Sequence, residues 1–358
     1  MNSKPFRVGI VGANAHRAWA HDAHIPALKG MPDFVLSAVS ARTQDLADEA
    51  AAAFGVPRAF GDSLALVRDP DIDIVAVTVK VPEHRAVVLA ALAAGKHVYC
   101  EWPLGRDLAE ARELAAAVTP ASHVMIGVQG VSSPAVRHAA RLVREGQLGA
   151  LKVLRVYAPT LGWGPEAPQY YAYLEDKRNG ATLETIGGGH TLAAIEEVVG
   201  PYTHVDALNS RLIPQMRVMG TGEMVERTSN DHMLVLGKHS SAAVSTLEVI
   251  GGVGAQFTLE LVGEKGSLRI ASAGEGGGFQ ADRLMLTTSF ASEPQPEHVL
   301  ADAQGAPINV AECYARLAAD IRAGTRTVPD FDYAVRLTRL LDVINAASES
   351  GHRQVLQG

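Results

Sequence analysis

The chain has 358 residues, 47% hydrophobic and 20% charged, which is the composition of a globular protein long enough for two domains. The net charge of −7 and the lack of a long Lys/Arg run argue against a nucleic-acid partner. No long apolar run predicts a membrane span, and the polar N-terminus (residues 1–7) lacks the apolar core of a signal peptide. Two distant cysteines, Cys100 and Cys313, favour a reducing, cytoplasmic setting over a disulfide framework.

The first third of the chain alternates short apolar runs with helical stretches. This alternation predicts an α/β fold with a doubly wound parallel sheet, the Rossmann arrangement. We expect strands at 6–11, 34–40, 72–79, 97–100 and 125–128, and helices at 18–30, 43–54, 85–94 and 104–118.

Beyond residue 149 the pattern changes to partly alternating strands with few helices between them, which predicts an antiparallel or mixed sheet in a second domain. We expect strands at 151–158, 205–211, 232–236, 242–250 and 255–262, and helices at 134–145, 191–199, 310–323 and 331–349. The last two helices are candidates to pack back on the first domain.

The segment Gly12-Ala-Asn-Ala-His-Arg17 joins the first expected strand to the first expected helix. A dinucleotide-binding fold has G-x-G-x-x-G here, which lets the backbone approach the pyrophosphate at a helix N-terminus. Only Gly12 matches a glycine of that pattern. Asn14 takes the second glycine position, where we expect it to tolerate a left-handed backbone. The alternative is an ordinary strand-to-helix turn.

The end of the second expected strand bears on the choice between NAD and NADP. An NAD-binding fold usually has an acid there that binds the ribose 2′-hydroxyl, whereas this chain has Val39-Ser-Ala-Arg-Thr43. The hydroxyls of Ser40 and Thr43 and the charge of Arg42 suit a 2′-phosphate, so NADP is favoured. The alternative is that Arg42 only begins a solvated helix.

Two segments give the chain a resemblance to a known family. One is AGKHVYCEWPLGRDLAEA, with Glu101-Trp102-Pro103; the other is NGATLETIGGGHTLAAIEEVVG, with His190. They resemble the glucose–fructose oxidoreductase / inositol dehydrogenase / MocA family, in particular the branch of the fungal galactose-pathway repressor. The resemblance covers nearly the whole chain. It implies an NAD(P)-binding Rossmann domain (1–128) and a substrate and dimerisation domain (129–358) with an open, mostly antiparallel sheet.

The chain departs from the family enzymes at two positions. Trp102 replaces the lysine of their Glu-Lys-Pro motif, and Ile186 stands where an aspartate usually precedes the catalytic histidine. The indole of Trp102 can stack on a sugar or on nicotinamide but cannot accept a proton. His190 is then the first acid–base candidate, against the alternative of a histidine satisfied by backbone. Lys80 is the second, against a surface or phosphate-binding lysine.

The other expected site residues follow from the same pattern. Glu101 is expected to hold the ribose or orient the nicotinamide, with a simple strand-end acid as the alternative; for His84 we favour a core histidine. The predicted cofactor contacts are Gly12, Asn14, Ala15, Ser40, Arg42, Thr43, Val79, His84, Glu101, Trp102 and Gln129. The predicted substrate contacts are Trp102, Trp163, Tyr170, Tyr173, Glu184 and His190; for the aromatic residues of 163–173, packing onto the sheet is an equal alternative.

These patterns favour an NAD(P)-dependent oxidoreductase that moves a hydride between nicotinamide and a sugar, a polyol or a related hydroxy or keto compound. The alternative is a catalytically silent NADP-binding regulator, which Trp102 and Ile186 leave open. The histidines lack metal-ligand spacing, so no metal is expected. The resemblance implies a homodimer or homotetramer, and no nucleic-acid or membrane partner is expected.

Overall fold

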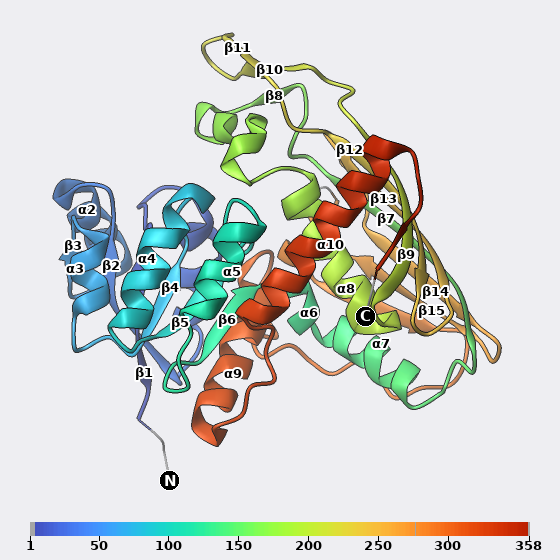
Figure 1. Cartoon of the computed structure of the whole chain (residues 1–358). Helices are drawn as coiled ribbons and strands as arrows, with labels where there is room; N and C mark the ends of the chain where they lie inside the picture. Colours follow the sequence, from blue (N-terminus) through green and yellow to red (C-terminus); the bar gives the residue numbers. More distant parts are fainter. Residues whose placement is uncertain (1–3, 276, 357–358) are drawn as a thin grey trace. The chain divides into compact units, whose positions relative to one another are not determined.

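The computed structural model describes residues 4–275 and 277–356 (Figure 1). The N-terminal residues 1–3, part of the polar segment noted above, lie outside this description. The chain forms two compact units. Unit 1 contains the residues up to Val128 together with Val299–Val335, and unit 2 contains Gln129–His298 with the residues from Arg336 onward.

Unit 1 is built on a six-stranded parallel sheet in the order β3-β2-β1-β4-β5-β6, which confirms the predicted Rossmann fold. The inner strands are almost wholly buried, which is why uninterrupted apolar runs identified them. The strands are β1 (Phe6–Val11), β2 (Phe34–Ser40), β3 (Ala59–Phe60), β4 (Ile74–Val77), β5 (His97–Glu101) and β6 (Val124–Gly127).

The helices of unit 1 include two whose starts differ from the prediction. Helix α4 begins at Val81 rather than Arg85, because Lys80 is its N-cap and Pro82 fits a first helical turn. Helix α5 begins at Leu108 rather than Leu104, because the carboxylate of Asp107 caps the backbone N–H of Glu110 at 2.9 Å. The helices are η1 (Ala20–His24), α1 (Ile25–Lys29), α2 (Gln44–Phe54), α3 (Ser63–Arg68), α4 (Val81–Ala93), α5 (Leu108–Ala116) and α9 (Pro307–Ala323).

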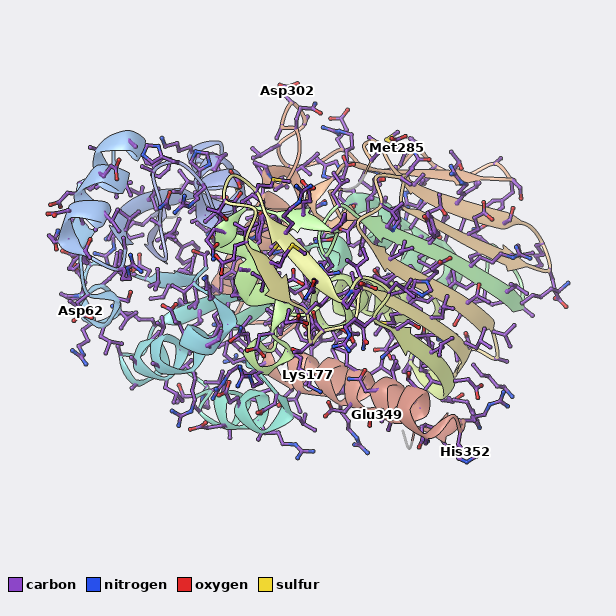
Figure 2. The ribbon with its side chains drawn as sticks, turned by 90° about the horizontal axis from the view of Figure 1, so that it is seen from above. Asp62, Lys177, Met285, Asp302, Glu349 and His352 are labelled. Carbon is purple, nitrogen blue, oxygen red and sulfur yellow. The ribbon has the colours of Figure 1, made fainter. Side chains whose placement is uncertain are left out.

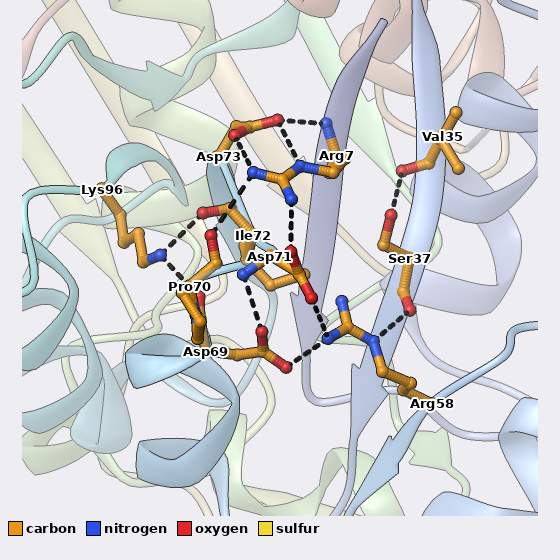
Figure 3. A network of polar contacts seen from close by, with 10 residues as sticks. All are labelled: Arg7, Val35, Ser37, Arg58, Asp69, Pro70, Asp71, Ile72, Asp73 and Lys96. Carbon is orange, nitrogen blue, oxygen red and sulfur yellow. Dashed lines mark hydrogen bonds and ion pairs between the residues drawn. The ribbon is translucent and has the colours of Figure 1, made fainter.

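A polar network fastens the amino-terminal edge of this sheet (Figure 3). The guanidinium of Arg7 donates to Asp73 at 2.8 Å, and the same carboxylate accepts from the Arg7 backbone N–H at 2.8 Å. The ammonium of Lys96 donates to the carbonyls of Asp69 and Ile72 at 2.6 and 2.7 Å. The Arg7 bonds join β1, and the Lys96 bonds join the residue before β5, to the segment that enters β4, so the network has a structural role.

His97 and His123 stack edge to face, with ring centroids 5.3 Å apart. Burial, followed by the charge of His123, lowers the pKa of His97 to about 4. The folded state therefore disfavours the protonated ring, so this contribution to stability is complete above about pH 6.5 and is lost as the pH falls towards 4.

We expect His97→Asn to reduce the loss of Tm between pH 7.5 and pH 5. The amide oxygen of Asn can still accept from the backbone N–H of His123, as the His97 ring does, but it does not titrate. Thermal melts at the two pH values measure the effect, with the exposed His352→Asn as control. An unchanged acid loss in His97→Asn would contradict this prediction.

Unit 2 contains an eight-stranded sheet in the order β16-β15-β14-β7-β13-β12-β9-β17 and a three-stranded sheet β11-β10-β8. All pairs of the large sheet are antiparallel except β13 with β7, which confirms the predicted open, mostly antiparallel sheet. The strands are β7 (Leu151–Thr160), β8 (Glu166–Ala167), β9 (Tyr202–Ser210), β10 (Gln215–Val218), β11 (Met224–Glu226), β12 (His232–His239), β13 (Val244–Gly251), β14 (Thr258–Gly263), β15 (Ser267–Ser272), β16 (Leu284–Thr288) and β17 (Gln354–Val355).

Helices cover one face of the large sheet, with α8 and most of α10 lying over it, and leave the opposite face open (Figure 1). Met285 projects from the edge strand β16, and Glu349 and His352 mark the end of α10 (Figure 2). Among the described residues, none of the helices is long and apolar enough to cross a membrane. The helices are α6 (Gln129–Ser132), α7 (Pro134–Arg144), η2 (Gln169–Glu175), η3 (Lys177–Asn179), η4 (Glu184–Gly188), α8 (Gly189–Val199), η5 (Phe279–Ala281) and α10 (Phe331–Ser350).

Candidate cofactor and substrate sites

The strand order of unit 1 reverses between β1 and β4, and α/β sheets bind their ligands outside the carboxyl ends of the strands at this point. Gly12 follows β1 there with φ +99°, a conformation that favours glycine. A Cβ at Gly12 would lie 2.8 Å from the Val79 side chain and 3.0 Å from its backbone nitrogen. Only glycine fits, because a side chain here would collide with the loop that follows β4.

The turn after Gly12 differs from the prediction in one respect. Asn14 has an ordinary negative φ, and the non-glycine residue with a left-handed backbone is Ala18, at φ +78°. The Asn14 side chain instead accepts from the backbone N–H of His16 at 3.0 Å, which tightens the turn. Ala15 is half-buried beside it.

The segment at the end of β2 has one exposed cation and two hydroxyls that already make hydrogen bonds within the protein. Ser40 is buried and its hydroxyl lies 3.1 Å from that of Ser63, and the hydroxyl of Thr43 caps α2 through Leu46. Arg42 is exposed between them. Of the three residues predicted to hold a 2′-phosphate, Arg42 is therefore the one best placed to do so.

The loops after β4 and β5 are joined by His84. Its Nε2 lies 2.9 Å from the Val79 carbonyl and its Nδ1 3.0 Å from the Pro103 carbonyl. Burial lowers the pKa of His84, which favours the neutral ring. Both nitrogens face main-chain atoms, as in the core histidine that we favoured. Lys80 is exposed at the start of α4, between these loops in sequence.

Glu101 ends β5, and Trp102 follows it with a cis peptide bond to Pro103. Trp102 is buried, whereas 13% of the Glu101 side chain remains exposed. The Glu101 carboxylate accepts from Nε2 of the buried His24 at 2.8 Å. No local pattern indicates this bond, because His24 lies 77 residues from Glu101.

His190 is the second residue of α8 and follows three consecutive glycines, Gly187 to Gly189, at the end of the π-helical turn η4. The glycines allow close packing on the sheet: a Cβ at Gly188 would lie 2.9 Å from the sulfur of Met233, and one at Gly187 would lie 3.1 Å from Val249. His190 is 4% exposed. Single π-turns occur frequently at functional sites, which agrees with a site role for this turn.

Glu184 begins η4 and is buried. Its carboxylate accepts from the amide of Asn230 at 2.5 Å. Gln129, the remaining predicted cofactor contact, is fully buried at the start of α6.

A fully buried guanidinium, that of Arg227, anchors the segment of unit 2 that contains the aromatic residues of 163–173, here called the aromatic loop. It makes an ion pair with Glu175, donates to Asp231 at 2.9 Å, and donates to the carbonyls of Trp163 and Gly164 at 2.8 and 2.7 Å. The ring of Trp163 is itself buried, which favours the packing alternative for that residue. Tyr170 is 39% exposed, and burial raises the pKa of Tyr173 to about 12.

Three residues of unit 1 lie at the carboxyl edge of its sheet, where folds of this kind bind a dinucleotide: Gly12 follows β1, the exposed Arg42 follows β2, and the partly exposed Glu101 ends β5. Within residues 4–275 and 277–356, no group of three or more His, Cys, Asp or Glu side chains is arranged to hold a metal. The fold and these residues define a protein of the NAD-binding oxidoreductase class.

Comparison with known proteins identifies the family. The oxidoreductase family with an NAD-binding Rossmann fold matches residues 6–129, and the Gal80p C-terminal domain family matches residues 134–272. A dehydrogenase of Aspergillus oryzae, aclE, is 30% identical over 98% of both chains. The chain belongs to the glucose–fructose oxidoreductase / inositol dehydrogenase / MocA family.

Two further comparisons show the range of proteins similar to this chain. The galactose/lactose metabolism regulatory protein GAL80 of Saccharomyces cerevisiae is 28% identical, over 86% of this chain and 75% of its own. The structure of a levoglucosan dehydrogenase in complex with NADH and levoglucosan has the same fold, with a TM-score of 0.80 and 21% identity over 99% of this chain and 100% of its own. The family therefore includes both enzymes and regulators.

Proposed function

We propose that this chain is an NADP-preferring oxidoreductase that transfers a hydride between nicotinamide and the carbinol carbon of a sugar, a polyol or a related compound. The observation that carries the proposal is the set of residues at the carboxyl edge of the unit 1 sheet: Gly12 takes the positive φ of the turn after β1, where such folds bind the pyrophosphate, and Arg42 offers charge for a 2′-phosphate. The similarity to the dehydrogenase aclE and to levoglucosan dehydrogenase supports the reaction class.

A bound nicotinamide supplies the hydride acceptor or donor. The chain must supply the group that takes the hydroxyl proton as the hydride leaves the carbon, and His190 is our first candidate. Trp102 replaces the family lysine, so it would contribute a ring surface rather than a proton acceptor. Lys80, exposed at the start of α4, is the second candidate.

We predict that Arg42→Ala weakens binding of NADP⁺ by about 10- to 100-fold, since a hydrogen bond to a charged group contributes about 1.5–3 kcal/mol. The affinity for NAD⁺ should stay nearly constant, because it has no 2′-phosphate. Calorimetric titration with both cofactors measures the two constants, and Arg112→Ala on α5, also exposed, is the matched control. Equal losses for NADP⁺ and NAD⁺ would contradict the assignment.

Turnover tests the proposed reaction. Protein with NADP⁺ is presented with a panel of sugars, polyols and anhydrosugars, and protein with NADPH with the corresponding keto compounds, while the absorbance of reduced nicotinamide is followed. We expect turnover with at least one hydroxy compound. Failure of the wild-type protein to bind either cofactor would reject the proposal at its first step.

Two observations favour a second function, that of an NADP-binding regulator. Trp102 occupies the position of the family lysine, and the match to the Gal80p C-terminal domain covers residues 134–272. The regulator would bind NADP and a protein partner without turnover. Cofactor binding together with silence across the whole panel would therefore favour it over the enzyme.

We also propose that the open face of the large sheet pairs with a second copy of the chain. Residues of five strands (β7, β9, β12, β13 and β14) line a hollow of about 580 Å³ there, and Leu208 and Leu236 are each 56% exposed. An exposed apolar patch of this kind favours an interface, and a two-fold axis would place the same patch on both copies.

Placing a charge in this patch should separate the copies. We expect Leu236→Glu to shift the mass measured by light scattering towards the monomer, because the interface would have to bury an unpaired carboxylate. Met224→Glu, on the exposed strand β11 of the small sheet, should leave the mass unchanged. A dimer in both variants would contradict the proposed interface.

A cytoplasmic location is our remaining proposal, in keeping with two buried free cysteines.

A further inference from the structure

A buried chain of three side chains ends at the carboxyl edge of the unit 1 sheet. The Tyr314 hydroxyl lies 2.8 Å from Nδ1 of His24, and Nε2 of His24 lies 2.8 Å from Oε1 of Glu101. Tyr314 and His24 are both 0% exposed, whereas the Glu101 side chain retains 13% exposure. Of these three side chains, a ligand can therefore reach only Glu101.

The direction of the hydrogen bonds follows from the Glu101 carboxylate, which can only accept, so that in a neutral ring Nε2 of His24 donates and Nδ1 accepts. Burial raises the pKa of Tyr314 well above its usual value, so the hydroxyl keeps its proton. Its O–H can therefore donate to Nδ1 of His24, while the Nε2 N–H donates to the Glu101 carboxylate. Tyr314 thus stabilises the tautomer that holds Glu101.

The three residues come from segments that are distant in sequence. His24 is the last residue of the π-turn η1, and Glu101 is the last residue of β5. Tyr314 lies on α9, in the second segment of unit 1 (Val299–Val335), which follows residues 129–298 of unit 2. The His24 ring packs against Tyr99 of β5 at 5.0 Å and against Tyr314 at 5.6 Å, measured between centroids. This packing leaves little room for the imidazole to turn.

We propose that His24 and Tyr314 are positioning residues for cofactor binding, holding Glu101 so that its carboxylate accepts from a hydroxyl or amide N–H at the nicotinamide-riboside end of the cofactor. The inference rests on the proposed function, because it places Glu101 against the cofactor. Neither His24 nor Tyr314 touches the ligand; both act through Glu101. Helix α9 is then part of the cofactor site, although residues 129–298 of unit 2 separate it in sequence from the first segment of unit 1.

The test compares affinity for whole NADP⁺ with affinity for 2′,5′-ADP, a fragment that lacks the nicotinamide riboside. His24→Leu should weaken NADP⁺ binding about tenfold or more, because Glu101 loses a charged hydrogen bond, and should leave 2′,5′-ADP binding unchanged. His24→Gln, whose amide can still donate to Glu101, should recover most of the loss. Thermal melts of the cofactor-free proteins report on folding separately.

A double-mutant cycle shows whether His24 acts through Glu101. If it does, His24→Leu adds little to the loss of NADP⁺ affinity already caused by Glu101→Gln. Tyr314→Phe is the mildest variant and tests the inference should His24→Leu fail to fold. We expect it to weaken NADP⁺ binding about threefold and to leave 2′,5′-ADP binding unchanged. Equal losses for NADP⁺ and 2′,5′-ADP, or wild-type NADP⁺ binding by Tyr314→Phe, would overturn the inference. A wild-type protein that binds neither compound would instead reject the proposed function.

Discussion

Replacing His190 with glutamine is expected to lower kcat by about 10²- to 10⁴-fold, the usual contribution of a positioned general acid–base group. Glutamine retains a polar side chain of similar size but cannot accept the hydroxyl proton. The affinity for NADP⁺ should hardly change, since the residues that we assign to the cofactor lie mainly on unit 1. Steady-state rates on the panel compound that gives turnover, together with cofactor titration, measure both quantities.

His239 provides the matched control for this variant. It is also a buried histidine of unit 2, with its ring nitrogens 2.9 Å from the Gly200 carbonyl and 2.9 Å from the Ser245 hydroxyl. We expect His239→Gln to lower Tm and leave kcat nearly unchanged. A normal kcat in His190→Gln would remove His190 from the proton transfer, and Lys80→Met would then test the second candidate.

Replacing Arg227 with methionine is expected to cost about 3–5 kcal/mol of the free energy of unfolding, the range for removing one partner of a buried ion pair. The change would leave Glu175 and Asp231, which are 3% and 2% exposed, without their shared cation. It would also leave the carbonyls of Trp163 and Gly164 without their donor. Chemical denaturation measures the loss.

Two further variants separate charge from packing in this cluster. The triple variant Arg227→Met, Glu175→Gln, Asp231→Asn removes all three charges and should recover part of the stability, because no buried carboxylate is then unpaired. Arg217→Ala breaks an exposed ion pair with Glu166 in the same unit and should cost less than about 1 kcal/mol. Equal losses for Arg227→Met and Arg217→Ala would contradict the role of Arg227 as the anchor of the aromatic loop.

The fold could be predicted from the sequence because each of its two sheets leaves a different pattern. The strands of the parallel sheet are buried on both faces, so they appear as apolar runs such as 6–11, which coincides with β1. The strands of the open sheet alternate instead, as in β13, where every second residue is buried. The small sheet was missed because β8, β10 and β11 have only two to four residues each.

The candidate site was less predictable, because its geometry depends on contacts between distant residues. The motifs located Gly12, Glu101 and His190, each of which follows a strand or a glycine-rich turn. No local pattern links Arg227 to Glu175, 52 residues away, or His24 to Tyr314, 290 residues away. The expected left-handed backbone was assigned to Asn14 rather than Ala18, since alanine gives no compositional sign of that conformation.

Transfer of deuterium from substrate to cofactor tests the proposed oxidoreductase most directly. The protein is incubated with NADP⁺ and a panel compound deuterated at its carbinol carbon, and the reduced cofactor is analysed by mass spectrometry and NMR. We predict reduced cofactor that carries the deuterium at C4 of the nicotinamide, and a loss of this signal in His190→Gln. A wild-type protein that binds NADP⁺ yet transfers no deuterium from any compound would contradict the enzyme and leave the regulator.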